Sequence, residues 1–348
     1  MTSNRLTCVV PTHNRPHFLR RLLRFYSRFQ PDFPLLVVDS SESSAAAENV
    51  AALDAVRENL QIQYRHMNLG IIDKCIEGLR SVQSPFVVFC ADDDFLFPGA
   101  VWRCVDFLET EPSFASAMGR TAMLDVKHLH GWCKVLKGYS IEDDLPIDRC
   151  RWMAQQWFSN FYAVHRTEER LSDFQIKPTR PDPLWSMSDT MLCQMSVLRG
   201  RLKVLPQMYA LRERHGDNAG TSMRHQRTAQ AELRYKRFLE CMADQIERAG
   251  IDRTEVEQFM ENSYGYSRGL NWENRKQQRS AVESIRHHFR GIVERAVDCV
   301  WTHHTRHRRF VRASDYAGDE LIWDAAVQLM RDYPQGAPSE PSVLKRCG

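Results

Sequence analysis

Three consecutive carboxylates, Asp92, Asp93 and Asp94, directly follow the apolar run Phe86–Ala91. Such a run is typical of a buried strand in a parallel sheet, and ligands of open α/β sheets bind just beyond the carboxyl ends of these strands. Three acids crowded at a strand end repel one another, and a hard cation such as Mg²⁺ or Mn²⁺ relieves the repulsion. Because a cation held by few carboxylates also binds phosphate oxygens, this acidic triplet indicates an enzyme that handles a phosphorylated donor.

The elements that must position the triplet alternate regularly along the first third of the chain. Strand patterns cover Leu6–Pro11, Leu35–Asp39, Ile62–His66 and Phe86–Ala91, and helical spacing covers Arg15–Phe29, Ala45–Asn59, Ile71–Val82 and Pro98–Glu111. This alternation predicts βαβ units, so we expect residues 1–112 to form a doubly wound, Rossmann-like half with a mostly parallel sheet. The dinucleotide fingerprint G-x-G-x-x-G does not follow the first strand.

The rest of the chain divides into three parts. Residues 113–220 are mixed: strands are expected at Ala115–Val126, Trp132–Gly138 and Leu202–Leu211, and helices at Asp148–Phe158 and Ser188–Leu198. Residues 221–333 lose the strand patterns and predict a helical domain, and residues 334–348 predict a loose tail. The fold class predicted is therefore α/β, followed by an α-helical C-terminal domain.

Composition excludes several classes of function. The chain has 348 residues, 43% apolar and 26% charged, with a net charge of +3. These values are ordinary for a soluble globular protein, and the even spread of Lys and Arg disfavours a nucleic-acid binder. No stretch approaches the roughly 20 apolar residues of a membrane span, and the opening residues lack a signal-sequence pattern, which predicts a cytoplasmic protein.

Ten cysteines are scattered without C-x-x-C pairs, so neither disulfides nor a zinc site are expected. Four of them lie in apolar runs and are predicted to be small core residues: Cys8, Cys75, Cys90 and Cys104.

Four short motifs resemble family 2 glycosyltransferases of the GT-A fold, in the family's order and roughly at its spacing. They are Val9–Pro16 (VVPTHNRP), Val37–Ser41 (VVDSS), Asn68–Gly70 (NLG) and Ala91–Asp94 (ADDD) with Pro98 beyond. Among bacterial members, the chain is most similar to those that build capsule, lipopolysaccharide or related surface glycans. The resemblance covers about residues 5–220 and implies a GT-A domain that uses a nucleotide sugar, commonly UDP-linked.

The resemblance assigns the segment after the first strand to the nucleotide. Pro11, Thr12 and Asn14 would cradle it, and Arg15 would contact phosphate. Backbone N–H groups and the helix dipole favour an anion or a nucleobase edge at this place. The alternative is an ordinary helix entry with a basic surface residue.

Asp39 would bind the nucleobase, or else cap the serine-rich turn behind it. Asn68 and Gly70 precede a helix, and Gly70 is compatible with a tight turn. Lys74, on that helix, would neutralise donor phosphate, or be merely solvated.

In the acidic triplet the resemblance implies that Asp92 faces the ribose, Asp93 lies nearest the metal, and Asp94 ligates directly or through water. The metal would be Mn²⁺ or Mg²⁺. The alternative, a solvated acidic loop, is disfavoured by the apolar strand before it.

An inverting transfer needs a base for the proton of the acceptor hydroxyl. Trp185–Leu192 resembles the family's acidic motif at a helix start, which assigns Asp189 as the general base. Asp189 could instead be a first-turn acid behind an N-cap at Ser188. Asp182, on the proline-rich loop 177–183, is a competitor for the role.

After the last predicted strand, His215 is the candidate for closing the site and reaching the metal or diphosphate, with Arg212 or Arg214 as phosphate partners. A structural or exposed histidine is the alternative. Trp157 and Trp185 are candidates for stacking on a sugar ring or for the core. The basic cluster Trp301–Phe310 is a candidate for contact with an anionic membrane, or a solvated helix end.

We therefore expect a metal-dependent inverting glycosyltransferase that moves a sugar from a UDP-linked donor to a glycan, lipid-linked or protein acceptor. It would be cytoplasmic or peripheral at the inner face of the membrane, with the helical domain serving acceptor binding or self-association. The alternatives are a non-catalytic nucleotide-sugar-binding protein and a sugar-phosphate nucleotidyltransferase. A nucleotidyltransferase usually has a glycine-rich phosphate loop near the N-terminus, and no glycine precedes Gly70 in this chain.

Overall fold

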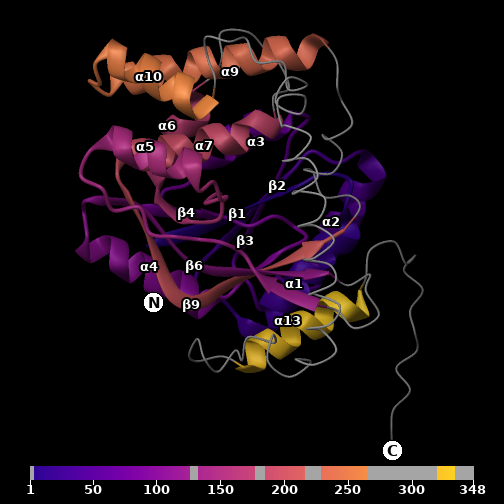
Figure 1. Cartoon of the computed structure of the whole chain (residues 1–348). Helices are drawn as coiled ribbons and strands as arrows, with labels where there is room; N and C mark the ends of the chain where they lie inside the picture. The colour runs from indigo at the N-terminus through magenta and orange to yellow at the C-terminus, as the bar shows by residue number, and fades with distance from the viewer. Residues whose placement is uncertain (1–3, 126–131, 177–184, 216–228, 265–319, 334–348) are drawn as a thin grey trace, which may run out of the picture.

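The computed structural model describes residues 4–125, 132–176, 185–215, 229–264 and 320–333. A nine-stranded sheet lies at its centre, in the order β3-β2-β1-β4-β8-β6-β9-β5, with β7 added on β6. Helices cover both faces of this sheet (Figure 1).

The first four strands form a parallel half-sheet. They are β1 (Leu6–Thr12), β2 (Leu35–Asp39), β3 (Ile62–His66) and β4 (Phe86–Phe89). The helices between and after them are α1 (Pro16–Phe29), α2 (Ser43–Asp54), α3 (Ile71–Arg80) and α4 (Pro98–Thr110). The predicted Rossmann-like half is thus confirmed, and its order 3-2-1-4 brings the carboxyl ends of β1, β2 and β4 to one edge.

The second half of the sheet is mixed. Its strands are β5 (Phe95–Leu96), β6 (Phe114–Asp125), β7 (Trp132–Val135), β8 (Val164–Arg166) and β9 (Arg201–Arg214). Strand β8 pairs antiparallel with β4 and β6, and β9 pairs parallel with β6 and antiparallel with β5. Sequence patterns predicted neither β5 nor β8, because strands of two and three residues are too short to show a period.

Three further helices pack close to the sheet: α5 (Pro146–Gln155), α6 (Thr167–Gln175) and α7 (Trp185–Arg199). Helix α6 was not predicted, and its polar sequence carries only a weak apolar stripe. The predicted helix Ala45–Asn59 and the predicted strand Phe86–Ala91 extend too far. Helix α2 ends at Asp54, and β4 ends at Phe89, the residue that pairs with Val9 of β1.

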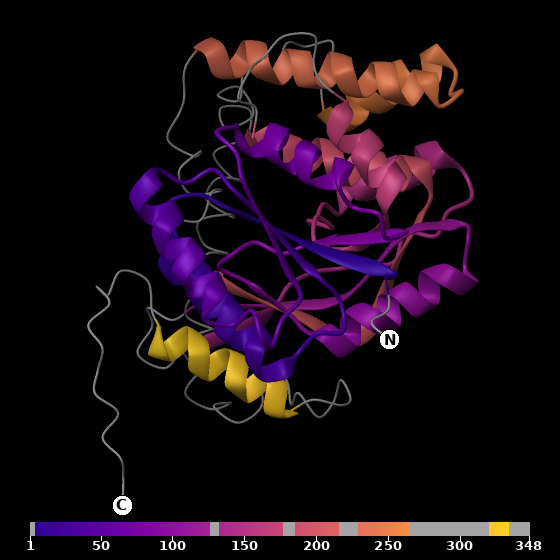
Figure 2. The same ribbon diagram turned by 180° about the vertical axis from the view of Figure 1, so that it is seen from behind.

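The described helices beyond residue 220 lie on two sides of the molecule. Helices α9 (Ala229–Arg248) and α10 (Arg253–Tyr264) form an outer layer over α5 and α7 (Figure 1). Helix α13 (Glu320–Asp332) lies along α1 on the opposite side, as Figure 2 shows from behind. None of the helices in the described ranges is both long and apolar enough to cross a membrane.

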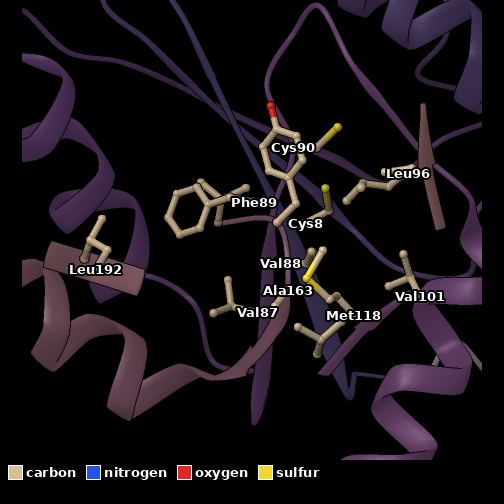
Figure 3. Packing of buried hydrophobic residues seen from close by; sticks show 14 of the residues in the cluster. Cys8, Val87, Val88, Phe89, Cys90, Leu96, Val101, Met118, Ala163 and Leu192 are labelled. Carbon is tan, nitrogen blue, oxygen red and sulfur yellow. The ribbon is translucent and has the colours of Figure 1, made fainter. Parts of the chain in front are cut away.

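The hydrophobic core surrounds β1 and β4. Figure 3 shows Cys8, Val88 and Cys90 packed between the strands and helix α4 at Val101. Cys8, Cys75, Cys90 and Cys104 are all fully buried, as predicted. This packing fixes the end of β4, from which the acidic triplet emerges.

Candidate functional site

The acidic triplet lies in the turn between β4 and β5, where all three side chains are almost fully buried. Asp92, Asp93 and Asp94 are 0%, 5% and 2% exposed. Buried carboxylates must be compensated by cations or hydrogen-bond donors. All three have such partners, and Arg15 is shared by Asp92 and Asp93.

Asp92 is held by the segment that follows β1. It accepts a hydrogen bond from Thr12 Oγ1 at 2.7 Å and forms an ion pair with Arg15. Burial and the neighbouring charge of Asp93 raise the pKa of Asp92 to about 6, although Arg15 opposes the shift.

Asp93 links the start of α1 to the end of β9. Its Oδ2 lies 3.1 Å from Arg15 Nη1 and 2.8 Å from His215 Nε2. Burial alone would raise the pKa of Asp93, but the hydrogen bond with His215 and the charge of Arg15 outweigh it and lower the pKa to about 2. The fold thus joins Asp93 and His215, which the sequence analysis singled out separately.

Asp94 is bound by protein donors at both of its oxygens. Tyr162 Oη donates to Oδ2 at 2.6 Å, Arg212 Nε donates to the same atom at 3.1 Å, and the Glu213 N–H donates to Oδ1 at 3.0 Å. These bonds tie the turn to β9 and to the loop before β8. We therefore assign Asp94 to holding the turn in place. Of the predicted metal ligands, Asp93 and His215 remain.

Asp39, expected to meet the nucleobase, is fully buried and bonded within the protein. Its Oδ1 accepts from the Ser41 N–H at 2.7 Å, and its Oδ2 accepts from Asn49 Nδ2 and Tyr64 Oη, each at 2.8 Å. The bond to Ser41 is the turn-capping alternative raised by the sequence. Because Asp39 is fully buried, a nucleobase could reach it only after the surrounding residues move.

The turn after β1 is locked to the turn after β2. Asn14 adopts φ 52°, a left-handed conformation that asparagine tolerates better than most residues. Its N–H donates to Ser41 Oγ at 2.7 Å, and its side-chain oxygen accepts from the Glu42 N–H at 2.8 Å. His13, beside it, is exposed and hydrogen bonded to the Ser40 carbonyl. Pro11 is buried within β1, whereas His13 and Asn14 are exposed.

Lys74 is buried and serves the scaffold, in contrast to the expected phosphate contact. Its ammonium donates to the Thr12 carbonyl and to Ser40 Oγ, which joins the ends of β1 and β2. Burial lowers the pKa of Lys74.

The segment before α3 is exposed at Asn68 and Gly70. Gly70 is the N-cap of α3, with φ −61° and ψ 161°, and a Cβ there would meet nothing within 4 Å. The backbone therefore does not require glycine at this position, and the role of Gly70 in donor binding stays a prediction.

Asp189 lies near the start of α7 and is half-buried. It accepts a hydrogen bond from Ser159 Oγ at 3.1 Å, and the Cys193 thiol lies 3.5 Å away. Ser159 precedes Tyr162 by three residues, and Tyr162 binds Asp94. Three residues span at most about 10 Å of chain, so this loop brings Asp189 to the same end of the sheet as the triplet.

Sequence reasoning missed Ser159 and Tyr162, because they lie in an irregular loop that has no periodic pattern. Trp157, in the same loop, is 47% exposed. Asp182 and the basic cluster Trp301–Phe310 lie outside the described residues, as does the predicted tail.

The residues present are compatible with a divalent cation. Asp93 Oδ2 and His215 Nε2, both suitable ligand atoms, lie 2.8 Å apart. Within the described ranges no group of three or more His, Cys, Asp or Glu side chains is arranged to hold a metal by itself. A cation bound here would complete its shell with diphosphate oxygens and water.

The chain is similar to known proteins in sequence and in fold. Residues 7–169 match the profile of the family described as "Glycosyl transferase family 2". No curated protein matches the chain significantly. Crystal structures of S. aureus TarS 1–349 are similar in fold: one has a TM-score of 0.54 at 16% identity and covers 78% of this chain and 77% of that chain. The same protein in complex with UDP-GlcNAc gives a TM-score of 0.56 at 17% identity, covering 78% of each chain. Residues 7–169 are thus similar to the family 2 glycosyltransferases, and the chain has the GT-A fold.

Proposed function

We propose that this glycosyltransferase moves a sugar from a UDP-linked donor to a hydroxyl of a surface glycan or glycoconjugate, with inversion at the anomeric carbon. The observation that carries the proposal is the loop from Ser159 to Tyr162, which binds Asp189 at one end and the acidic triplet at the other. A base and a site for a charged leaving group are both needed for this reaction. The binding of UDP-GlcNAc by TarS supports a UDP-linked donor.

The donor diphosphate would lie at the exposed sides of Arg15 and Arg212, whose side chains are 25% and 32% exposed. Guanidinium groups bind phosphate through paired N–H donors and remain charged at any working pH. The buried carboxylates of the acidic triplet hold the Arg15 and Arg212 side chains in place, so their N–H donors are oriented before the substrate binds. The exposed His13 and Asn14 would face the nucleoside.

Asp93 and His215 would hold a Mn²⁺ or Mg²⁺ ion. Such a cation supplies charge stabilisation to the departing diphosphate.

The reaction is a single displacement. The acceptor oxygen forms a bond to the anomeric carbon while the bond from that carbon to the diphosphate oxygen breaks. The electron pair of the broken bond leaves with UDP, and Asp189 takes the proton of the acceptor hydroxyl. Ser159 donates to one oxygen of Asp189 and so orients the carboxylate, because a fixed hydrogen bond restricts its rotation.

Donor hydrolysis tests the proposal without knowledge of the acceptor. The purified chain is incubated with a panel of nucleotide sugars, with Mn²⁺ or with EDTA, and free nucleotide is measured. We expect slow release of UDP from one α-linked UDP-sugar, and proton NMR should show the β-anomer of the free sugar first. Early appearance of the α-anomer would refute inversion, and no release from any donor in Mn²⁺ would refute the transfer reaction.

A further inference from the structure

A buried arginine behind the acidic triplet connects three distant parts of the chain. Arg21, on α1, is 1% exposed. Its Nη2 donates to the main-chain carbonyl of Asp93 at 2.6 Å, and its Nη1 forms an ion pair with Glu213 of β9. The guanidinium also lies over the rings of Phe18 and Phe95, 5.0 and 5.5 Å from their centroids.

These contacts fix the relative position of Asp93 and His215. Arg21 binds the backbone of Asp93 directly, and Glu213 precedes His215 by two residues on the same chain segment. Phe18, beneath the guanidinium, packs against the His215 ring with centroids 4.7 Å apart. One planar, rigid donor group thus sets both the carboxylate side and the imidazole side of the site.

The C-terminal helix reaches the same arginine. Arg21 Nη1 lies 3.3 Å from the main-chain carbonyl of Tyr333, directly after α13. Carbonyls at a helix end lack partners within the helix, and a buried guanidinium is a suitable donor for them. Helix α13 is seated by buried Ala326 and Met330, and Trp323 contacts Phe97 just beyond the triplet, with centroids 6.2 Å apart. Figures 1 and 2 both show α13 alongside α1.

We propose that Arg21 is a positioning residue for glycosyl transfer: it holds Asp93 and His215 in their working geometry, and the end of α13 completes its set of partners. The inference rests on the proposed donor site. It adds helix α13, which lies far beyond residues 7–169 in the sequence, to the elements that support the donor site. Arg21 is too deeply buried to contact the donor, so it acts through the residues that it binds.

A purely structural ion pair is the competing explanation, and the variants separate the two. Removing Arg21 alone would leave Glu213 buried without its cation, which is strongly destabilising. Replacing both partners by apolar residues of similar size is often tolerated. The informative variant is therefore the double substitution R21M/E213M, with Arg21→Lys as the conservative change. Arg24→Met is the matched control, because Arg24 lies on the same helix and stacks on the Tyr333 ring at 4.5 Å.

Four quantities are measured in the full chain: the thermal unfolding midpoint, UDP affinity by titration calorimetry, and kcat and KM for donor hydrolysis. In folded R21M/E213M we expect kcat/KM to fall about 10- to 100-fold, since displacements of about 1 Å have costs of this size. UDP affinity should fall about tenfold, and Arg21→Lys should lie between this variant and wild type. Arg24→Met should keep both values within twofold.

Wild-type UDP affinity and kcat/KM in folded R21M/E213M would overturn the proposal. If the double variant does not fold, Arg21→Lys decides: a wild-type unfolding midpoint with reduced kcat/KM supports positioning, and wild-type kcat/KM overturns it. Failure of the donor site itself is a separate result, because the wild-type chain would then neither bind UDP nor hydrolyse any donor.

Discussion

Asparagine at position 189 should abolish most transfer while leaving the donor site intact. The substitution keeps the shape of the side chain. It also keeps an oxygen that can accept the hydrogen bond from Ser159, which is 3.1 Å long in the wild-type protein. It removes the group that accepts the proton. A positioned general base contributes about 10²- to 10⁴-fold to a rate, which corresponds to about 3 to 5 kcal/mol in the activation barrier.

We therefore expect Asp189→Asn to lower kcat by about 10²- to 10⁴-fold, with UDP affinity within twofold of wild type. The assay measures UDP release from the donor found in the hydrolysis panel, together with UDP titration calorimetry. Asp148→Asn is the control, because Asp148 is likewise a half-buried carboxylate near the start of a helix, α5. A wild-type rate in Asp189→Asn would refute the assignment of the base. A parallel loss of UDP affinity would place Asp189 in donor binding instead.

Three further substitutions test the scaffold. Tyr162→Phe removes the 2.6 Å hydrogen bond to buried Asp94 and should lower the free energy of unfolding by about 1.5 to 3 kcal/mol. Urea denaturation measures this value, and an unchanged free energy would contradict a stabilising role for the bond. Gly119→Ala should cost about 1 to 3 kcal/mol in the same assay, because its Cβ would lie 2.6 Å from Tyr209 Cβ; full stability would contradict this close packing. Asp39→Asn tests a pH dependence: burial would raise the pKa of Asp39, but hydrogen bonds from Ser41 and Asn49 outweigh it and lower the pKa below 3.8. The ionised carboxylate therefore stabilises the fold above about pH 4, and this contribution is lost as the pH falls through the lowered pKa. The stability difference between wild type and Asp39→Asn should be constant from pH 7 to 5 and shrink below pH 4, whereas a difference independent of pH would contradict the role of the charge.

The sequence predicts the parallel half of the fold well, because its strands and helices are long enough to show their periods. It also places the acidic triplet at a strand end, since an abrupt change from apolar residues to carboxylates needs no knowledge of distant partners. The structure confirms that these carboxylates are buried at the end of β4.

What the sequence cannot give is which donors satisfy each carboxylate. Asp39 and Lys74 were expected to contact the ligand, yet both side chains are buried and hydrogen bonded to neighbouring protein groups. Arg21 meets Glu213 across 192 residues of sequence, and no local pattern marks either one. Such pairings depend on how separate elements pack, which a local pattern does not encode.

Binding of UDP is the requirement from which every later step follows. We would titrate wild type, Asp93→Asn and Asp32→Asn with UDP, in Mn²⁺ and in EDTA; Asp32 is an exposed carboxylate between α1 and β2. Wild type and Asp32→Asn should bind UDP more tightly with Mn²⁺ than with EDTA, and Asp93→Asn should bind at least tenfold more weakly in Mn²⁺. Equal UDP affinity in Asp93→Asn and wild type, or no UDP binding by wild type, would contradict a donor site at the acidic triplet.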